Sequence, residues 1–244
     1  MSGKHDADPH SISPPEESYA ASLAESPPSL HGLRAAFSSD LGGIVPCTPE
    51  VARVCLKAAR WFAGQGAEVE EGTCMDLSGA GEVFQVLRAE MFAGQGDLLG
   101  RRDLIKPELA WQIEKGMAQT PEEVEEARRA QGRIARAAEE FFRRWDLLLC
   151  PTAMVPPFDA KINWLQECQG TQFDNYVDWL LPTSALSLTN CPCLSVPCGF
   201  TATGLPVGLQ IVAAPGQEAV LLRVGSAFEQ AHGIHRKVPV ASVG

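Results

Sequence analysis

The chain has 244 residues, of which 45% are hydrophobic and 20% are charged, and its formal net charge is −10. This balance is typical of a soluble globular protein and excludes a chain that is disordered throughout. The acidic charge argues against nucleic acid or a membrane as partner, because both anionic surfaces favour clustered Lys and Arg. No run approaches about 18 consecutive apolar residues, so no transmembrane helix is predicted. The polar N-terminus lacks the apolar core of a secretory signal, which favours the cytoplasm.

The eight cysteines are predicted to be free thiols, because the chain is long enough to build an ordinary core and shows no secretory signal. The tightest cluster is Cys191, Cys193 and Cys198, and its spacing is not that of a zinc site. The nearest histidine, His232, lies well away in the sequence. We therefore expect no metal and a reducing compartment.

The first part of the chain predicts an extended lead-in and then one β-α-β unit. Prolines interrupt residues 1–30, so this segment is predicted to be extended. Residues 33–37 and 67–70 are predicted strands. Between them, Thr48-Pro49 marks a helix start, and Gly64-Gln65-Gly66 marks its end. The unit implies a parallel strand pair.

A helical region follows, with candidate helices over 78–92 and 106–115. Thr120-Pro121-Glu122-Glu123 then has the pattern of a capping box at the start of a helix of about 25 residues that reaches Trp145. That helix leads directly into the apolar run 146–150. A continuous apolar run of this length indicates a strand that is buried on both faces.

The C-terminal part is irregular over 153–190 and regular afterwards. Predicted strands over 194–198 and 207–212 flank the turn Thr201–Gly204, which indicates a hairpin. A final helix is predicted over 217–232, with Gly233 as its stop signal. The predicted fold class is α/β, with a mixed β-sheet flanked by helices.

The residues alone do not assemble a catalytic site. The chain has no Gly-x-Ser-x-Gly elbow, no P-loop and no His-Glu-x-x-His motif. None of the five histidines has an evident nucleophile as partner. Glu122, Glu123, Glu125 and Glu126 occupy the first turns of the long helix, where carboxylates complement the helix dipole. We interpret this cluster as a solvated surface rather than an acid–base pair.

One series of motifs is nevertheless specific. It consists of Asp146–Thr152 (DLLLCPT), Leu188–Phe200 (LTNCPCLSVPCGF) and Gly204–Val212 (GLPVGLQIV). This series resembles the C-terminal half of the amidase signature family. Ser39–Gly42 and Pro107–Gly116 extend the resemblance upstream, so that it covers essentially the whole chain. The resemblance implies an incomplete amidase-signature-type fold, with residues 1–30 as lead-in and residues 31–244 as the C-terminal portion of an amidase domain.

Members of this family are serine hydrolases of carboxamides that need no cofactor. The resemblance implies a Lys–Ser–Ser triad, in which a lysine activates a bridging serine and that serine activates the nucleophile. A Gly/Ser-rich loop supplies the backbone N–H groups that hold the oxyanion. This sequence contains no such Gly/Ser-rich segment. We therefore assign no catalytic residue and no cofactor.

Three residues are carried over as substrate-binding candidates by the resemblance, namely Thr152, Trp179 and Cys191. Each has a packing alternative: Thr152 as a strand-end cap, Trp179 as a core aromatic and Cys191 as a small filler. The chain departs from the family pattern at two positions, with Asn190 in place of a common Gly and Cys193 in place of a common Ala. Asn tolerates left-handed backbone better than most residues, so the first change is interpreted as conservative unless the backbone at Asn190 must approach a substrate closely.

The leading hypothesis is therefore the C-terminal portion of an amidase-type hydrolase that acts on C–N bonds of small carboxamides. We expect it to be inactive alone and to need an N-terminal half, encoded upstream or supplied by a partner chain or a homo-oligomer. Two alternatives stay open outside catalysis: a substrate-binding or regulatory module, and a truncated gene remnant. Within the family, the alternative is a glutamine amidase like the one in the tRNA amidotransferases.

Overall fold

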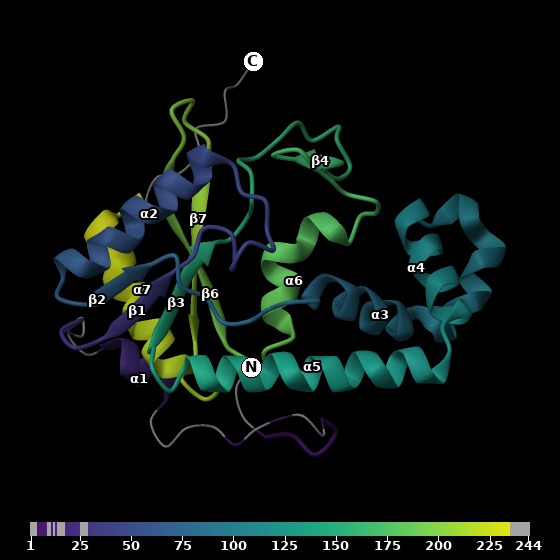
Figure 1. Ribbon diagram of the computed structural model, residues 1–244, viewed down its shortest axis with the longest axis horizontal. Helices are drawn as coiled ribbons and strands as arrows, with labels where there is room; N and C mark the ends of the chain where they lie inside the picture. Colours follow the sequence, from purple (N-terminus) through teal and green to yellow (C-terminus); the bar gives the residue numbers. More distant parts are fainter. Residues whose placement is uncertain (1–3, 9–10, 12, 14–17, 25–28, 235–244) are drawn as a thin grey trace.

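The centre of the protein is a five-stranded mixed sheet. The computed structural model describes residues 4–8, 11, 13, 18–24 and 29–234. The sheet strands are β1 (Arg34–Phe37), β2 (Glu68–Glu71), β3 (Leu147–Pro151), β6 (Cys193–Phe200) and β7 (Pro206–Ala213). They lie in the order β2-β1-β3-β7-β6 (Figure 1). β1 runs parallel to β2 and β3, whereas β7 runs antiparallel to β3 and β6. The predicted α/β class with a mixed sheet is confirmed.

Helices cover both faces of this sheet. One core contains residues of α2 (Pro49–Gly64) and α7 (Glu218–His232). The other contains residues of α3 (Ala80–Phe92), α5 (Pro121–Phe141) and α6 (Leu181–Ser187). Along β3, Leu147 and Leu149 belong to the first core, and Leu148 and Cys150 belong to the second. This alternation is the period-two geometry of a strand, and both faces of β3 are buried as predicted.

The predicted β-α-β unit is present. β1 and β2 pair in parallel, with Arg34 opposite Glu68, and α2 connects them. Pro49 occupies the first turn of α2, where a proline loses no hydrogen bond because those N–H groups have no intrahelical partner. Val51, Cys55 and Phe62 point from α2 into the core. The helical spacing of these apolar residues is what places α2 on the sheet.

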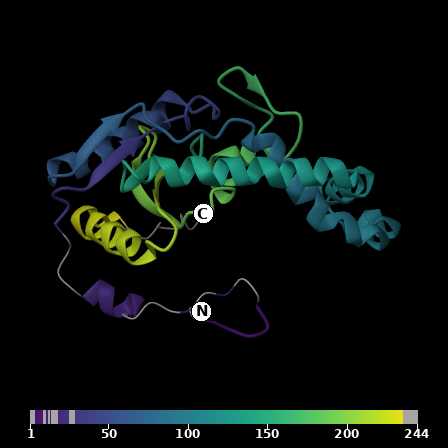
Figure 2. The ribbon, with the colours of Figure 1, turned by 60° about the horizontal axis from the view of Figure 1, so that its bottom comes forward.

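The long helix α5 begins at the predicted capping box. The Thr120 hydroxyl oxygen accepts a hydrogen bond from the Glu123 N–H (3.2 Å), and the Glu123 carboxylate accepts one from the Thr120 N–H (2.8 Å). Figure 2 shows α5 lying beside the sheet at one end and reaching away from it at the other. The helix ends at Phe141, earlier than predicted. The chain turns there because Trp145 enters the core and the Asp146 carboxylate accepts the Arg34 N–H (2.8 Å).

Several short elements were not predicted from the sequence. They are α1 (Tyr19–Ala24) in the lead-in, α6, the 3-10 helices η1 (Ala93–Leu104) and η2 (Asp178–Leu180), and the ribbon of β4 (Glu167–Cys168) with β5 (Thr171–Gln172). Helix α4 (Pro107–Ala118) extends the predicted 106–115 segment by one turn at its C-terminus. The rest of the predicted lead-in, residues 1–3, 9–10, 12, 14–17 and 25–28, lies outside the described residues.

The C-terminal elements agree with the sequence. β6 and β7 form the predicted antiparallel hairpin, with Ser195 opposite Gln210. α7 ends at Gly233, whose φ of 60° is left-handed. No helix in residues 18–24 or 29–234 is long and apolar enough to cross a membrane.

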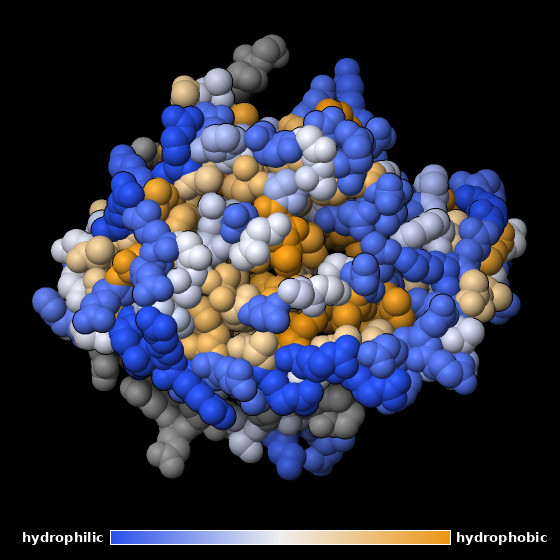
Figure 3. Space-filling view, in the orientation of Figure 1, coloured by the Kyte–Doolittle hydropathy of each residue, from blue (hydrophilic) through white to orange (hydrophobic). Residues whose placement is uncertain are grey.

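An apolar groove of about 770 Å³ lies between α3 and α5. Its floor includes Val83, Val86, Ala127 and Ile134, and carboxylates such as Glu122 lie at its rim. Figure 3 shows apolar side chains gathered over the middle of this face, framed by charged ones. The described part of the chain therefore leaves part of the second core open.

The packing of α4 against α3 predicts which helical glycine is essential. A Cβ at Gly116 would collide with the Ala89 carbonyl oxygen, whereas a Cβ at Gly132 on α5 would meet its nearest atom at 3.7 Å. We expect Gly116→Ala to lower the free energy of unfolding by about 1–3 kcal/mol. Gly132→Ala should raise it by up to about 1 kcal/mol, because alanine is the better helix former. Urea denaturation of both variants checks this, and an equal effect of the two substitutions contradicts it.

Candidate functional site

A crevice lies at the carboxyl ends of β1 and β3. From β1 the chain crosses one face of the sheet through α2, and from β2 it crosses the other face through α3 and α5 to β3. The strand order therefore reverses between β1 and β3. Open α/β sheets bind ligands outside the carboxyl ends of the strands at such a reversal. Two cavities of about 390 and 180 Å³ lie near the loop after β1 and share Ile44, Pro46 and Thr171 as lining residues. This crevice is the candidate site.

The loop after β1 holds a strained conformation at the mouth of the crevice. Leu41 has a φ of 50°, which is costly for a bulky residue, and its side chain is 2% exposed. The Ser38 hydroxyl donates to the Asp40 carboxylate (3.0 Å) and accepts from the Gly42 N–H (3.1 Å). The Val45 N–H donates to the Asp40 carbonyl oxygen (2.9 Å). Burial of Leu41 and these bonds together maintain the strain, and strained backbone is concentrated at binding sites.

Thr152 begins the loop after β3 and lies directly over β7. Its hydroxyl shares a hydrogen bond with the Ser195 hydroxyl of β6 (2.7 Å), and its N–H donates to the Gly208 carbonyl oxygen (3.0 Å). A Cβ at Gly208 would lie 2.9 Å from the Thr152 Oγ1 and 3.2 Å from the Ser195 Oγ. The glycine in the middle of the GLPVGLQ motif therefore makes room for a pair of hydroxyls. The sequence motif signalled Gly208, but nothing in the pattern assigned a role to Ser195.

Trp179 lies at the same end of the sheet as Thr152. Its ring makes an edge contact with Phe158, with centroids 5.8 Å apart. Three residues later, the Pro182 carbonyl oxygen accepts from the amide of Gln210, which lies opposite Cys150 near the end of β3. The Trp179 Nε1 is buried and has no hydrogen-bond partner. An indole N–H in that position is a donor available to a carbonyl oxygen.

Cys191 lies at the other end of the sheet. The carbonyl oxygen of the adjacent Pro192 accepts a hydrogen bond from the N–H of Ala213 on β7 (3.2 Å). Thr152 instead pairs with Gly208, which lies further toward the start of β7. Five residues of β7 separate these two levels, which corresponds to roughly 17 Å. As substrate-binding residues all three candidates stay predictions. Thr152 and Trp179 lie toward the same end of the sheet, and neither lines the two crevice cavities. Asn190, just before Cys191, has the left-handed φ of 60° that its substitution for glycine suggests.

The described residues do not assemble an activated nucleophile. Within residues 4–8, 11, 13, 18–24 and 29–234, no Ser or Thr hydroxyl hydrogen-bonds to a Lys or His side chain, and no cluster of His, Cys, Asp and Glu could hold a metal. All eight thiols are free. Desolvation by burial raises the pKa of Cys47 and of Cys74 to about 12, so both stay protonated near neutral pH. What the crevice offers is shape, hydrogen-bond donors and acceptors.

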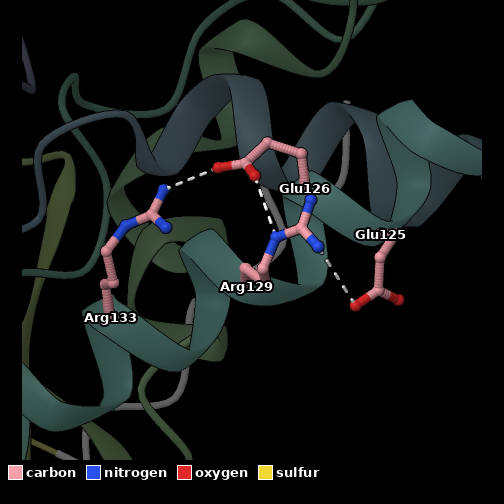
Figure 4. A network of polar contacts seen from close by, with 4 residues as sticks. All are labelled: Glu125, Glu126, Arg129 and Arg133. Atoms are coloured by element: carbon pink, nitrogen blue, oxygen red, sulfur yellow. Dashed lines mark hydrogen bonds and ion pairs between the residues drawn. The ribbon is translucent and has the colours of Figure 1, made fainter.

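The carboxylates at the start of α5 form a surface network, as predicted. Figure 4 shows Glu126 between Arg129 and Arg133, each 3.0 Å away, with Glu125 on the other side of Arg129. The hydrogen bonds from Arg133 and Arg129 lower the pKa of Glu126. A carboxylate with a lowered pKa in an exposed ion-pair network is a poor general acid.

Comparison with known proteins decides the family. The Amidase family model matches residues 1–222. The chain belongs to the amidase signature family. An acylamidase of Rhodococcus erythropolis is 31% identical over 249 aligned residues, which cover 100% of this chain and 51% of that enzyme. The A-type subunit of a glutamyl-tRNA(Gln) amidotransferase, from Geobacillus kaustophilus, is 40% identical over 107 residues, or 44% of this chain and 21% of that protein.

Solved structures of this amidase family share the fold. A bacterial aryl acylamidase superposes with a TM-score of 0.80 at 21% identity and covers 96% of this chain, which in turn covers 50% of that enzyme. A 6-aminohexanoate cyclic dimer hydrolase superposes with a TM-score of 0.76 at 23% identity. The match covers 98% of this chain and 52% of that enzyme. The chain therefore spans about half the length of the relatives that match it over its whole length.

The hydroxyl pair over Gly208 gives a testable coupling in this amidase fold. Gly208→Ala should lower the free energy of unfolding by about 1–3 kcal/mol, because its Cβ displaces Thr152 and Ser195. Thr152→Ala removes the hydroxyl and makes room, so the double variant should be less destabilised than the sum of the single effects. Urea denaturation of the three variants measures the coupling. Strict additivity would show that the two positions do not touch.

Two half-buried thiols give a second test. At pH 8, Cys47 and Cys74 should react with iodoacetamide about 10³-fold more slowly than in the denatured chain, since their pKa is raised from 9.0 to about 12. The native rate should rise with pH as the thiolate fraction grows toward pH 12. Peptide mass spectrometry follows each cysteine with and without guanidinium. Equal rates in the native and denatured chain would contradict the burial of both thiols.

Proposed function

We propose that this chain is the substrate-facing portion of an amidase-type hydrolase that acts on C–N bonds of small carboxamides. The crevice at the carboxyl ends of β1 and β3 carries the proposal, because Thr152 and Trp179 present a hydroxyl and an unpartnered indole N–H at that end of the sheet. Both groups can hydrogen-bond to an amide. The end-to-end match to the acylamidase supports an acyl amide as the substrate class.

We further propose that hydrolysis needs a nucleophile-bearing segment that these 244 residues do not contain. The sequence has no Gly/Ser-rich segment of the kind that the family uses, and the described residues pair no Ser or Thr hydroxyl with a lysine. Two surface features support a covering segment, supplied by the same gene or by a partner chain. β6 is an edge strand, and the groove between α3 and α5 exposes an apolar floor. Uncovered edges and apolar grooves are interaction surfaces in soluble proteins.

A glutamine amidase is the second candidate within the family. The local identity of 40% to the glutamyl-tRNA(Gln) amidotransferase protein favours it. That match covers 44% of this chain, whereas the acylamidase match covers 100%. We rank the acylamidase activity first for that reason.

The eight free thiols support a reducing compartment, and we propose the cytoplasm.

The experiment compares the chain alone with a fusion in which it replaces the matching half of the Rhodococcus acylamidase. The chain alone should release no aniline from acetanilide and no ammonia from glutamine, because it lacks an activated nucleophile. The fusion should hydrolyse acetanilide in preference to glutamine. Activity of the chain alone that survives repeated purification would contradict the need for a second segment. A folded fusion without activity on either amide would contradict the substrate-facing role.

In an active fusion, Trp179→Phe tests the indole donor. We expect KM for acetanilide to rise up to about tenfold, the worth of one hydrogen bond, because the ring is retained and only the N–H is lost. Trp111→Phe is the matched control, since Trp111 lies on α4 beside Lys115. Equal KM values for the wild type and both variants would remove Trp179 from the site and leave it as a core aromatic.

A further inference from the structure

A second cavity lies outside the crevice, between α3, α4 and the segment 153–177. It has a volume of about 210 Å³ and shares no lining residue with the two crevice cavities. Arg88 and Phe92 come from α3, and Lys106 precedes α4. The remaining lining residues are Glu108, Leu109, Gln112, Asn163 and Tyr176. Three separate segments of the chain thus contribute polar groups to one small volume.

Gln112 forms the buried part of this lining. The residue is 2% exposed, and neither its side-chain oxygen nor its side-chain nitrogen has a hydrogen-bond partner. A buried polar group without a partner costs about 1–3 kcal/mol, so native proteins leave few of them unpaired. The Gln112 amide lines the cavity, and its oxygen and nitrogen both lack partners. It is therefore suited to hydrogen-bond with a molecule inside the cavity.

The same cavity contains charges of both signs. The Arg88 guanidinium donates to the Tyr176 hydroxyl (3.1 Å) and lies 5.6 Å from the Phe92 ring centroid, while its Nε is buried and unpartnered. Glu108 accepts from the Asn163 amide through one carboxylate oxygen, and its other oxygen is buried and unpartnered. Lys106 adds an exposed ammonium group. Three lining side chains thus retain unsatisfied polar atoms, one cationic, one anionic and one amide.

We propose that this cavity binds a small amino-carboxylate, a molecule that carries a carboxylate and an N–H donor a few bonds apart. The carboxylate pairs with Arg88 and Lys106, and the N–H group pairs with the free oxygen of Glu108. Gln112 supplies one further donor and one further acceptor. Charge-assisted hydrogen bonds are stronger than hydrogen bonds between neutral groups. They therefore favour a ligand that carries both a carboxylate and an N–H donor. The inference is independent of the proposed function, because the cavity is separate from the crevice.

Trapped water is the competing explanation for the unpaired atoms. A water molecule takes about 30 Å³ in the liquid and bridges two to four polar groups, so several waters fit a cavity of 210 Å³. The two explanations differ in ligand selectivity. Water alone gives no preference among small solutes, whereas the opposed charges of Arg88 and Glu108 favour a molecule with both poles over either half of it.

The test is calorimetric titration of the full 244-residue chain at pH 7 with L-alanine, propionate and ethylamine. L-alanine should bind saturably, and propionate and ethylamine should each bind at least about tenfold more weakly, since each lacks one charge-assisted contact. Equal binding of the three, or no saturable heat from L-alanine, would overturn the proposal and leave water as the occupant.

Two glutamine variants complete the test. Gln112→Met keeps the length of the side chain and removes its polar atoms, so L-alanine binding should fall at least about tenfold while the ligand-free melting temperature holds or rises. Gln119→Met is the matched control, because the Gln119 amide donates to the Val86 carbonyl oxygen and does not line the cavity. It should leave L-alanine binding unchanged. Unchanged binding in Gln112→Met, or equal losses in both variants, would contradict the site.

Discussion

Burial of β3 on all sides is the constraint on which the rest of this structure depends. Each of its five residues is buried, its two edges pair with β1 and β7, and its two faces enter different cores. Full burial of one leucine is worth about 1.5–3 kcal/mol, so Leu147, Leu148 and Leu149 tie both helical layers to one strand. The parallel and antiparallel parts of the sheet meet along this strand. The loop that follows this strand begins at Thr152, so the core and the crevice share one anchor.

The crevice is built from details that stability alone does not explain. Leu41 keeps a left-handed backbone beside it, Gly208 leaves room for two hydroxyls, and the Trp179 indole N–H is buried without a partner. Each feature costs stability or gives up a possible contact. Such costs persist at sites that hold a ligand. These features support the proposed positioning of an amide, and the proposed bond cleavage would require a nucleophile that the described residues do not assemble.

The main elements could be predicted because local chemistry and tertiary structure agree there. The apolar run of β3, the capping box at Thr120 and the stop at Gly233 each depend on residues close in sequence. The ribbon of β4 and β5 and the helix α6 were missed because they are short and depend on distant contacts, such as that between Gln210 and Pro182. The separation of Cys191 from Thr152 could not be predicted either. It follows from the register of β3 and β6 on β7, which no local pattern encodes.

Hydrogen exchange of the β3 amides tests the central role of this strand most directly. If β3 anchors both cores, the amides of Leu147–Cys150 exchange only when the whole chain unfolds, and their exchange free energy equals the free energy of global unfolding. Amides of the edge strand β2, whose residues are mostly exposed, should exchange through smaller openings. Exchange of the β3 amides as fast as that of the β2 amides, at a free energy well below that of global unfolding, would contradict the account.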